Sequence, residues 1–305
     1  MLSRTAQNLF WMGRYIERAD ATARLIEMGR RMAMLPGANE EWRSVALACG
    51  CAEALPEVAT DSEIISYLLL DRENRSSIQS CIAQARANAK AIRTALTADM
   101  WEALNDHWRL LEALDADEAI SDLPVWLDWA KQRAAAFRGA AETSLLRNEG
   151  YVFLRLGEYV ERAEMTLRLL DVKYYVLLPE TDVVGGGRDF HQWTSVLRAT
   201  SAVRAYHHVY RGDYTPWGIA EFLVLNTTFP RSANFCYRAL ERHLDELAKL
   251  YGERHDCHEI VADMVGRLER CDIQTLFQTG LHEFIGDAIQ VTNRLSAEIS
   301  RAYHF

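Results

Sequence analysis

The sequence predicts an all-α fold, a single helical bundle of about a dozen helices, and two observations lead to it. Apolar residues recur three and four positions apart along almost the whole chain, as at Leu9, Met12 and Ile16, which is the spacing of one helix face. Alternating runs of β-branched and aromatic residues, which strands would need, are missing. We therefore expect helices and essentially no sheet.

Helix boundaries are predicted where proline, glycine and short polar residues interrupt this spacing. We also expect Pro230 to stand in the first turn of a helix, because the stretch Asn226-Thr227-Thr228 ahead of it can cap one. The predicted breaks, in chain order, are Leu35-Pro36-Gly37, the surroundings of Pro56, Asp71 to Asn74, the residues before Pro124, Pro179 to Gly187, Arg211 to Pro216, and Phe229-Pro230.

Composition narrows the choice of partners. The 305 residues carry 34 basic and 43 acidic side chains, a net charge of -9, and the basic ones are scattered along the helices. This distribution disfavours nucleic acid and anionic membranes as partners. No window reaches the roughly 18 consecutive apolar residues of a membrane span, and the first residues lack the pattern of a secretory signal. We expect a cytoplasmic protein.

An internal repeat is the strongest feature of the sequence. Residues 13–25 read GRYIERADATARL and residues 157–169 read GEYVERAEMTLRL, with eight of thirteen positions identical. Two weaker echoes follow in the same order, Trp42-Arg43-Ser44-Val45 with Trp193-Thr194-Ser195-Val196, and Arg75-Ser76 with Arg231-Ser232. They predict a duplication with halves 1–148 and 149–305, packed together about a pseudo-twofold axis as one domain over 1–305.

The repeat also supplies the candidate site. Each copy places a tyrosine, a glutamate and an arginine within four residues of one helix, which predicts two Glu-Arg pairs and two tyrosines flanking a central cleft. Such a cleft could bind a carboxylate, a phosphate or an amine. With one residue ahead of the second copy and one from the third echo, the candidates are Tyr15, Glu17, Arg18, Tyr159, Glu161, Arg162, Glu149 and Arg231.

A purely structural interpretation stands beside this one. Asp20 with Arg24 and Glu164 with Arg168 form acid-before-base pairs four residues apart, which support a helix. The two copies begin with Gly13 and Gly157. Glycine lowers helix propensity, so its presence inside a helix predicts that another backbone approaches closely there. On this interpretation the glutamates hold the bundle together through arginine or tryptophan on a neighbouring helix.

The sequence lacks the motifs of several well-known classes of enzyme and metal site. None of the nine histidines has a glutamate three residues before it, so the Glu-x-x-His pattern of di-iron bundles is missing. The sequence also lacks His-Glu-x-x-His, Gly-x-Ser-x-Gly and the phosphate-binding Gly-x-x-x-x-Gly-Lys loop. We predict no cofactor and no metal site, and no catalytic residue can be assigned from the sequence.

The stretches NLFWMGRYIERADATARL and EGYVFLRLGEYVERAEMTLRL resemble the bacterial alpha-E family, and the resemblance extends over essentially the whole chain. It implies an all-helical fold. Genes of this family often lie beside circularly permuted ATP-grasp ligases and transglutaminase-like or peptidase proteins. The resemblance therefore implies a role in making or modifying small peptides, with an ATP-grasp or transglutaminase-like protein as partner.

Three functional hypotheses remain open at this point. The first is an accessory, non-catalytic subunit that binds the ligase or its peptide through the Glu-Arg cleft. The second is an enzyme with Glu17 or Glu161 as general base, Tyr15 or Tyr159 as acid, and an arginine as oxyanion stabiliser, which needs a raised glutamate pKa in a closed pocket. The third is a homo-oligomeric scaffold in which the repeat only packs helices.

Overall fold

The structure, a computed structural model, describes residues 1–34, 41–56, 58–175 and 186–305, and these contain helices and no strand. The all-α prediction is confirmed, with fifteen α-helices in the described residues against the dozen expected. Short 3-10 turns cover Ala52–Ala54 and Arg93–Ala95. The α-helices are α1 (Ser3–Ala33), α2 (Glu41–Ala48), α3 (Asp61–Leu69), α4 (Ile78–Ala91), α5 (Ala98–Ala113), α6 (Ala116–Ser121), α7 (Leu123–Ser144), α8 (Glu149–Tyr175), α9 (Gly187–Ala199), α10 (Val203–Tyr210), α11 (Pro216–Leu225), α12 (Ala233–Tyr251), α13 (Asp256–Arg270), α14 (Ile273–Thr279) and α15 (Leu281–Ala302).

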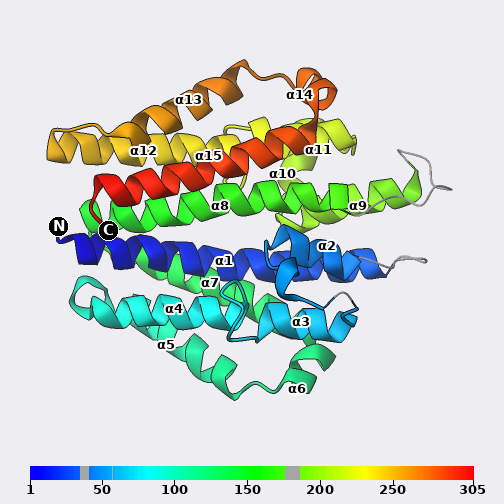
Figure 1. Cartoon of the computed structure of the whole chain (residues 1–305), viewed down its shortest axis with the longest axis horizontal. Helices are drawn as coiled ribbons and strands as arrows, with labels where there is room; N and C mark the ends of the chain where they lie inside the picture. Colours follow the sequence, from blue (N-terminus) through cyan, green and yellow to red (C-terminus); the bar gives the residue numbers. More distant parts are fainter. Residues whose placement is uncertain (35–40, 57, 176–185) are drawn as a thin grey trace.

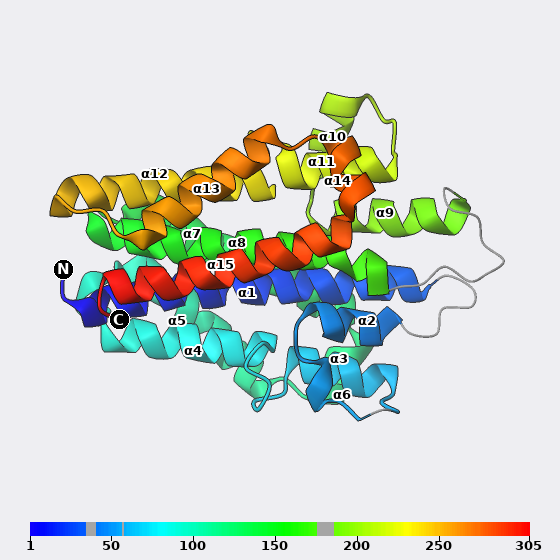
Figure 2. The ribbon, with the colours of Figure 1, turned by 45° about the horizontal axis from the view of Figure 1, so that its top comes forward.

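Two long helices, α1 and α8, run side by side in the same direction through the middle of the molecule (Figures 1 and 2). The other helices surround this pair, with α4 and α7 packed on α1 and α12 and α15 packed on α8. Both central helices are buried on nearly all sides, including charged residues such as Glu17 and Glu161. A helix buried all round cannot place its charges in water, so they need partners inside the protein.

The close approach of α1 and α8 depends on the two repeat glycines. A Cβ atom at Gly13 would lie 2.4 Å from the carbonyl oxygen of Leu154, and one at Gly157 would lie 2.0 Å from the carbonyl oxygen of Phe10. Both distances are impossible for a side chain, so only glycine allows the backbones to meet. The predicted close backbone contact at both glycines is confirmed.

Helix contacts in the two halves correspond in kind. Helix α1 packs on α4, α4 on α5 and α5 on α7, while α8 packs on α12, α12 on α13 and α13 on α15. Each central helix also receives a short helix of the other half, because α9 packs on α1 and α2 packs on α8. The duplication itself stays a prediction from the sequence, and α10 of the second half has no counterpart in this series of contacts.

Most predicted breaks that fall on described residues separate helices, at Pro56, 71–74, the position before Pro124, 211–216 and 229–230. The break at 35–37 and most of the one at 179–187 lie outside the described residues. The start predicted at Pro230 is wrong, since α12 begins at Ala233 with Ser232 as its cap. The Asn226 side chain accepts instead from the backbone N–H groups of Thr228 and Phe229 and shapes the turn ahead of the helix.

Among the helices in the described ranges, none combines the length and the apolar composition that crossing a membrane requires.

Candidate functional site

The two Glu-Arg dipeptides of the repeat bind each other across the contact between α1 and α8. The Glu17 carboxylate accepts from Nε and Nη2 of Arg162, both at 2.8 Å. Reciprocally, the Glu161 carboxylate accepts from Nε and Nη2 of Arg18, at 2.5 and 2.9 Å. Each glutamate thus takes its bidentate partner from the other copy of the repeat, in the fork geometry that makes such pairs strong.

Around Glu17 the site is closed and rich in arginine. Arg138 of α7 and Arg231, from the turn before α12, each lie 3.0 Å from the Glu17 carboxylate, and both also bind Asp20. Neither acidic side chain is exposed. Burial raises the pKa of the Glu17 carboxyl, but Arg162, Arg138 and Arg231 outweigh it and hold that pKa well below its ordinary value.

Around Glu161 the partners differ. Arg14 donates from Nε to Glu161 at 2.7 Å and from Nη2 to Glu164 at 3.2 Å, while Arg168 donates from Nε and Nη2 to Glu164 at 3.0 and 2.8 Å. Burial raises the pKa of the Glu161 carboxyl, but Arg18 and Arg14 outweigh it and lower the pKa to about 2. Glu161 is therefore a carboxylate at every physiological pH.

The predicted pairs four residues apart are present and do more than support their helices. Arg24 binds Asp20 at 3.1 Å and also donates to the carbonyl of Ala199, the last residue of α9, at 2.9 Å. Arg168 in the same way donates to the carbonyl of Ala48, the last residue of α2, at 3.1 Å. Each guanidinium caps the end of a short helix from the other half.

The expected cleft flanked by both Glu-Arg pairs is not what the structure contains. Glu17 and Glu161 are fully buried, and Arg162 is nearly so, because the pairs fill the contact between α1 and α8. This corrects the symmetric cleft predicted from the sequence. The structural interpretation describes the Glu17 side, where both carboxylates are fully buried beneath Arg138 and Arg231.

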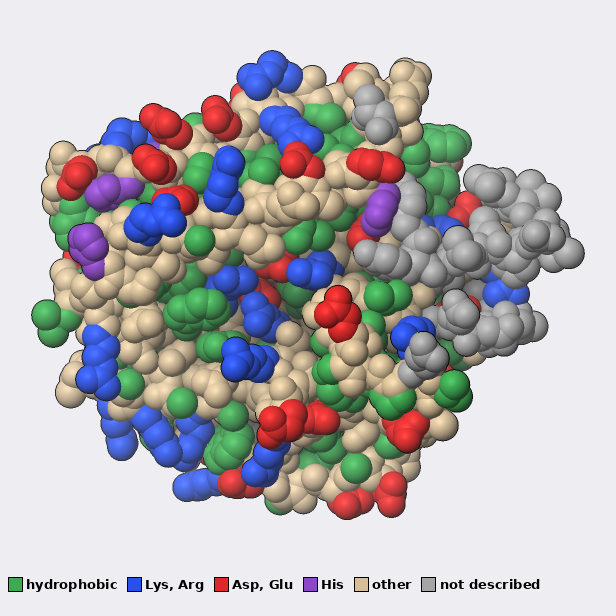
Figure 3. All heavy atoms as spheres, viewed as in Figure 1, with side chains coloured by type: hydrophobic (Ala, Val, Ile, Leu, Met, Phe, Trp, Pro, Cys, Tyr) green, Lys and Arg blue, Asp and Glu red, His purple; other side chains and the backbone are tan. Residues whose placement is uncertain are grey.

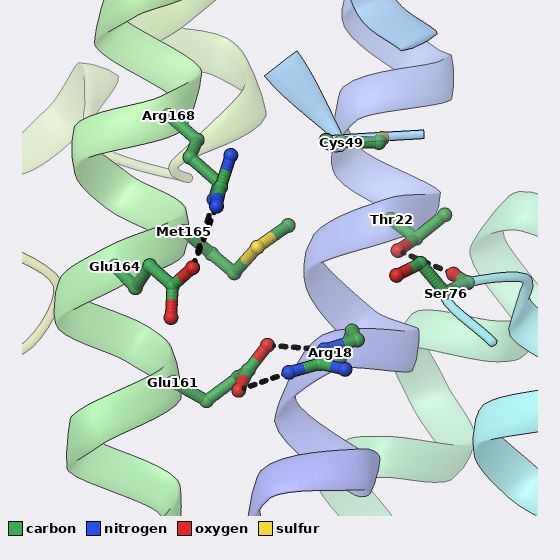
Figure 4. A pocket seen from close by; sticks show the side chains of 9 residues that line it. Arg18, Thr22, Cys49, Ser76, Glu161, Glu164, Met165 and Arg168 are labelled. Atoms are coloured by element: carbon green, nitrogen blue, oxygen red, sulfur yellow. Dashed lines mark hydrogen bonds and ion pairs between the residues drawn. The ribbon is translucent and has the colours of Figure 1, made fainter. Parts of the chain in front are cut away.

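On the Glu161 side, however, the network opens into a pocket of about 180 Å³. Figure 4 shows Arg18 and Glu161 facing each other across the gap between α1 and α8, with Met165 pointing between the helices. Figure 3 shows Lys and Arg side chains gathered near the middle of one face, over the line where α1 and α8 meet. The pocket is lined by Arg18, Thr22, Cys49, Gly50, Ser76, Glu161, Glu164, Met165 and Arg168.

The remaining candidates lie away from this pocket. The Tyr159 hydroxyl is buried and accepts from Nη2 of Arg155 at 2.7 Å. Tyr15 is half-buried and packs on Trp11, with ring centroids 5.7 Å apart. Glu149 lies at the start of α8, 2.8 Å from the amino terminus. Arg231 joins the Glu17 cluster, so the structure places five of the eight candidates in two ion-pair clusters, one around Glu17 and one around Glu161, and leaves out both tyrosines and Glu149.

The structure does not meet the condition that the general-base hypothesis requires. It requires a glutamate whose pKa is raised in a closed pocket, and the pKa values of both Glu17 and Glu161 are lowered. Neither tyrosine lines the pocket that contains Glu161. Within the described part of the chain, no three His, Cys, Asp or Glu side chains are grouped so that they could hold a metal ion.

Two arginines of the ion-pair clusters, Arg14 and Arg138, were not among the candidates predicted from the sequence. Arg14 lies one turn before Arg18, and its position on that face was a usable signal. Arg138 lies 121 residues from Glu17, and nothing in the local pattern of α7 links the two. Only the packing of α7 on α1 brings them together.

Comparison with known proteins agrees with this architecture. Uncharacterised proteins of Mycobacterium bovis (Mb2597) and Mycobacterium tuberculosis (Rv2567) are each 22% identical over 295 residues, which covers 88% of this chain and 32% of each relative. The chain thus spans about a third of the length of the curated relatives it matches. No solved structure matches it. A family model described as a predicted alpha-helical domain with a conserved ER motif matches residues 1–304, and the chain therefore belongs to the Alpha-E family.

Proposed function

We propose that the chain is a non-catalytic binding module of a bacterial system that makes or modifies small peptides, and that it acts beside a circularly permuted ATP-grasp ligase or a transglutaminase-like protein. The observation that carries the non-catalytic part is the state of the two glutamates of the Glu-Arg motif. General-base catalysis at neutral pH works best with a carboxyl pKa raised towards 7. The arginines around Glu17 and Glu161 lower both pKa values instead.

The length of the relatives supports the idea of a module. The match covers 32% of each of them, so in those proteins a similar helical unit is joined to about twice as much additional sequence. A unit that occurs within a longer chain is positioned to act on the substrate or product of the attached part. For this chain, a separate partner protein would take the place of the attached part. A partner that uses ATP would act in the cytoplasm, and the module with it.

The route of binding differs from the one predicted from the sequence. A partner cannot reach Glu17 or Arg162 without separating α1 from α8, because both side chains are enclosed. We therefore place partner contact on the outer helices, and leave the pocket at Arg18 and Glu161 as the accessible part of the motif.

The test uses the purified chain and the ATP-grasp protein encoded in the same genome. Co-elution of the two in size-exclusion chromatography, together with a rise in ATP-dependent peptide ligation when the chain is added, is the expected result. A helical protein of similar charge that lacks the motif serves as control. Turnover of peptide by the chain alone would replace this proposal with the enzyme hypothesis.

The scaffold hypothesis is separated from the proposal by sedimentation of the chain on its own. A monomer that associates only with the ligase or the transglutaminase-like protein supports the module. A concentration-independent homo-oligomer that associates with neither protein favours the scaffold.

A further inference from the structure

The Glu17 and Glu161 sides of the network differ by one arginine, and the difference can be traced to two equivalent turns. The turn before α12 holds Arg231, whose guanidinium lies 3.0 Å from Glu17 and 2.6 Å from Asp20. The turn before α4 approaches the other side of the central pair. Thr22 of α1 donates there to the carbonyl of Ser76 at 3.2 Å.

The two turns are built by the same hydrogen bonds, 155 residues apart. In each turn a serine caps the following helix and its hydroxyl donates back to a carbonyl six residues earlier, and a cysteine thiol donates to a carbonyl of the turn. The matching bonds are Ser77 to Asp71 with Ser232 to Asn226, Ser80 to Ser77 with Phe235 to Ser232, and Cys81 to Arg75 with Cys236 to Pro230.

This correspondence places Ser76 at the position of Arg231, since 76 and 231 also differ by 155. Pairing Arg75-Ser76 with Arg231-Ser232, as the sequence suggests, is therefore wrong by one residue in the structure. Arg231 extends onto its glutamate and fills the space beside it. Ser76 is too short to do so, and it lines the pocket of about 180 Å³ beside Glu161.

The hydrogen-bonding groups that have no partner decide which ligand this pocket can bind. All four carboxylate oxygens of Glu161 and Glu164 already accept from Arg14, Arg18 or Arg168. A cation entering the pocket would have to compete with these guanidiniums for the carboxylate oxygens. Among the described residues, by contrast, Nη1 of Arg18 and the hydroxyl of Ser76 have no hydrogen-bond partner and can both donate.

The local charge agrees with the free donors. Three guanidiniums, those of Arg14, Arg18 and Arg168, surround two carboxylates, so the cluster keeps one positive charge in excess. Arg18 and Arg168 remain partly accessible, with 19% and 22% of their side chains exposed, whereas Glu161 and Glu164 show 1% and 8%. The side of the cluster that faces the pocket is therefore cationic.

We propose that this pocket binds a small oxyanion, with Nη1 of Arg18 and the hydroxyl of Ser76 as its donors. A guanidinium anchored by a buried carboxylate presents its remaining N–H groups in a fixed direction, which favours oxyanions over neutral molecules. An apolar cavity of about 150 Å³ holds a molecule as large as benzene, so the space suffices for a carboxylate with a few carbon atoms or for a phosphate. This inference goes beyond the proposed function and does not depend on any protein partner.

The test is calorimetric titration of the purified chain with sodium acetate and, separately, with inorganic phosphate, at constant ionic strength. Acetamide, which has the shape of acetate without its charge, is the ligand control. We expect saturable binding of at least one of the two anions and none of acetamide. Preference for acetate identifies a carboxylate as the ligand class, and preference for phosphate identifies a phosphoryl group.

Two variants locate the binding. Ser76→Arg places a guanidinium where the other half has Arg231, and it should weaken the titrated binding at least tenfold. Ser62→Arg adds the same charge at an exposed position of α3 and should leave the binding unchanged. Ser76→Gln fills the pocket without added charge, so it keeps the test valid if Ser76→Arg does not fold. Absence of saturable binding to wild type, equal binding of acetamide, or equal binding by the Ser76 and Ser62 variants would overturn the proposal.

Discussion

Replacing Glu17 by glutamine tests whether the network holds the two central helices together. Glu17 is completely buried and accepts four hydrogen bonds, two from Arg162 and one each from Arg138 and Arg231. Glutamine keeps the shape but removes the charge, which leaves Arg162 without its bonded carboxylate and Arg138 and Arg231 with Asp20 alone. Removing one partner of a buried ion pair costs about 3–5 kcal/mol, because the remaining charge stays buried and unpaired.

The assay is urea unfolding followed by circular dichroism. With a denaturant slope of about 3 kcal/mol per molar, a loss of about 4 kcal/mol lowers the midpoint by about 1.3 M. Glu158→Gln is the matched control on the same helix pair. Burial raises the pKa of Glu158, and among the described residues this carboxylate binds Arg155 alone where Glu17 binds three arginines, so neutralising it should lower the midpoint much less. Equal midpoints for the two variants would refute this account of the network.

Three further outcomes are expected. Gly157→Ala should lower the urea midpoint, because its methyl carbon would lie 2.0 Å from a carbonyl oxygen of α1. Gly139→Ala has open space around it and should raise the free energy of unfolding by the helix-propensity gain of about 1 kcal/mol, and the midpoint with it. The reverse order of the two midpoints would contradict the close helix contact. Since the folded-state pKa of Glu161 is depressed to about 2, its stabilisation is present above pH 4.5 and is lost as the pH falls towards 2. The difference in urea midpoint between wild type and Glu161→Gln should shrink over that window, and a constant difference would argue against the ion pairs. Iodoacetamide at pH 8 should label half-buried Cys51 before buried Cys81, as read by mass spectrometry. The hydrogen bond with Cys49 lowers the pKa of Cys51, whereas burial raises the pKa of Cys81 to about 12. Faster labelling of Cys81 would mean that α4 opens.

The features that sequence predicted well are those whose physics is local. Helical spacing identified the fold class, and the helix-propensity cost of Gly13 and Gly157 indicated a backbone contact that the structure contains. Breaks with proline and the polar stretch 71–74 were located, but two breaks marked only by a capping side chain were not. Thr97 and Asp115 each cap a helix by accepting from its first turn, and neither stands beside a proline.

What sequence could not supply is the pairing between distant segments. The spacing of Glu17 and Arg18 shows that they are neighbours on α1 but does not show that each binds a residue of α8. The same limit applies to Arg138, and to the pocket, which exists because one turn carries Ser76 where its counterpart carries Arg231. An alignment error of one residue in that turn was enough to hide the difference.

The exchange of partners between the two Glu-Arg dipeptides has a consequence for how the chain folds. Glu17 and Arg162 are separated by 145 residues, and Arg18 and Glu161 by 143, so each glutamate takes its bidentate partner from the other half. A half that forms first lacks these bidentate pairs, although Arg138 of the first half can already bind Glu17, and it gains the rest of their stabilisation only when the other half docks. Contacts this distant slow folding, because chain entropy is lost before they form. They also couple the halves, so the bundle should melt in one cooperative transition.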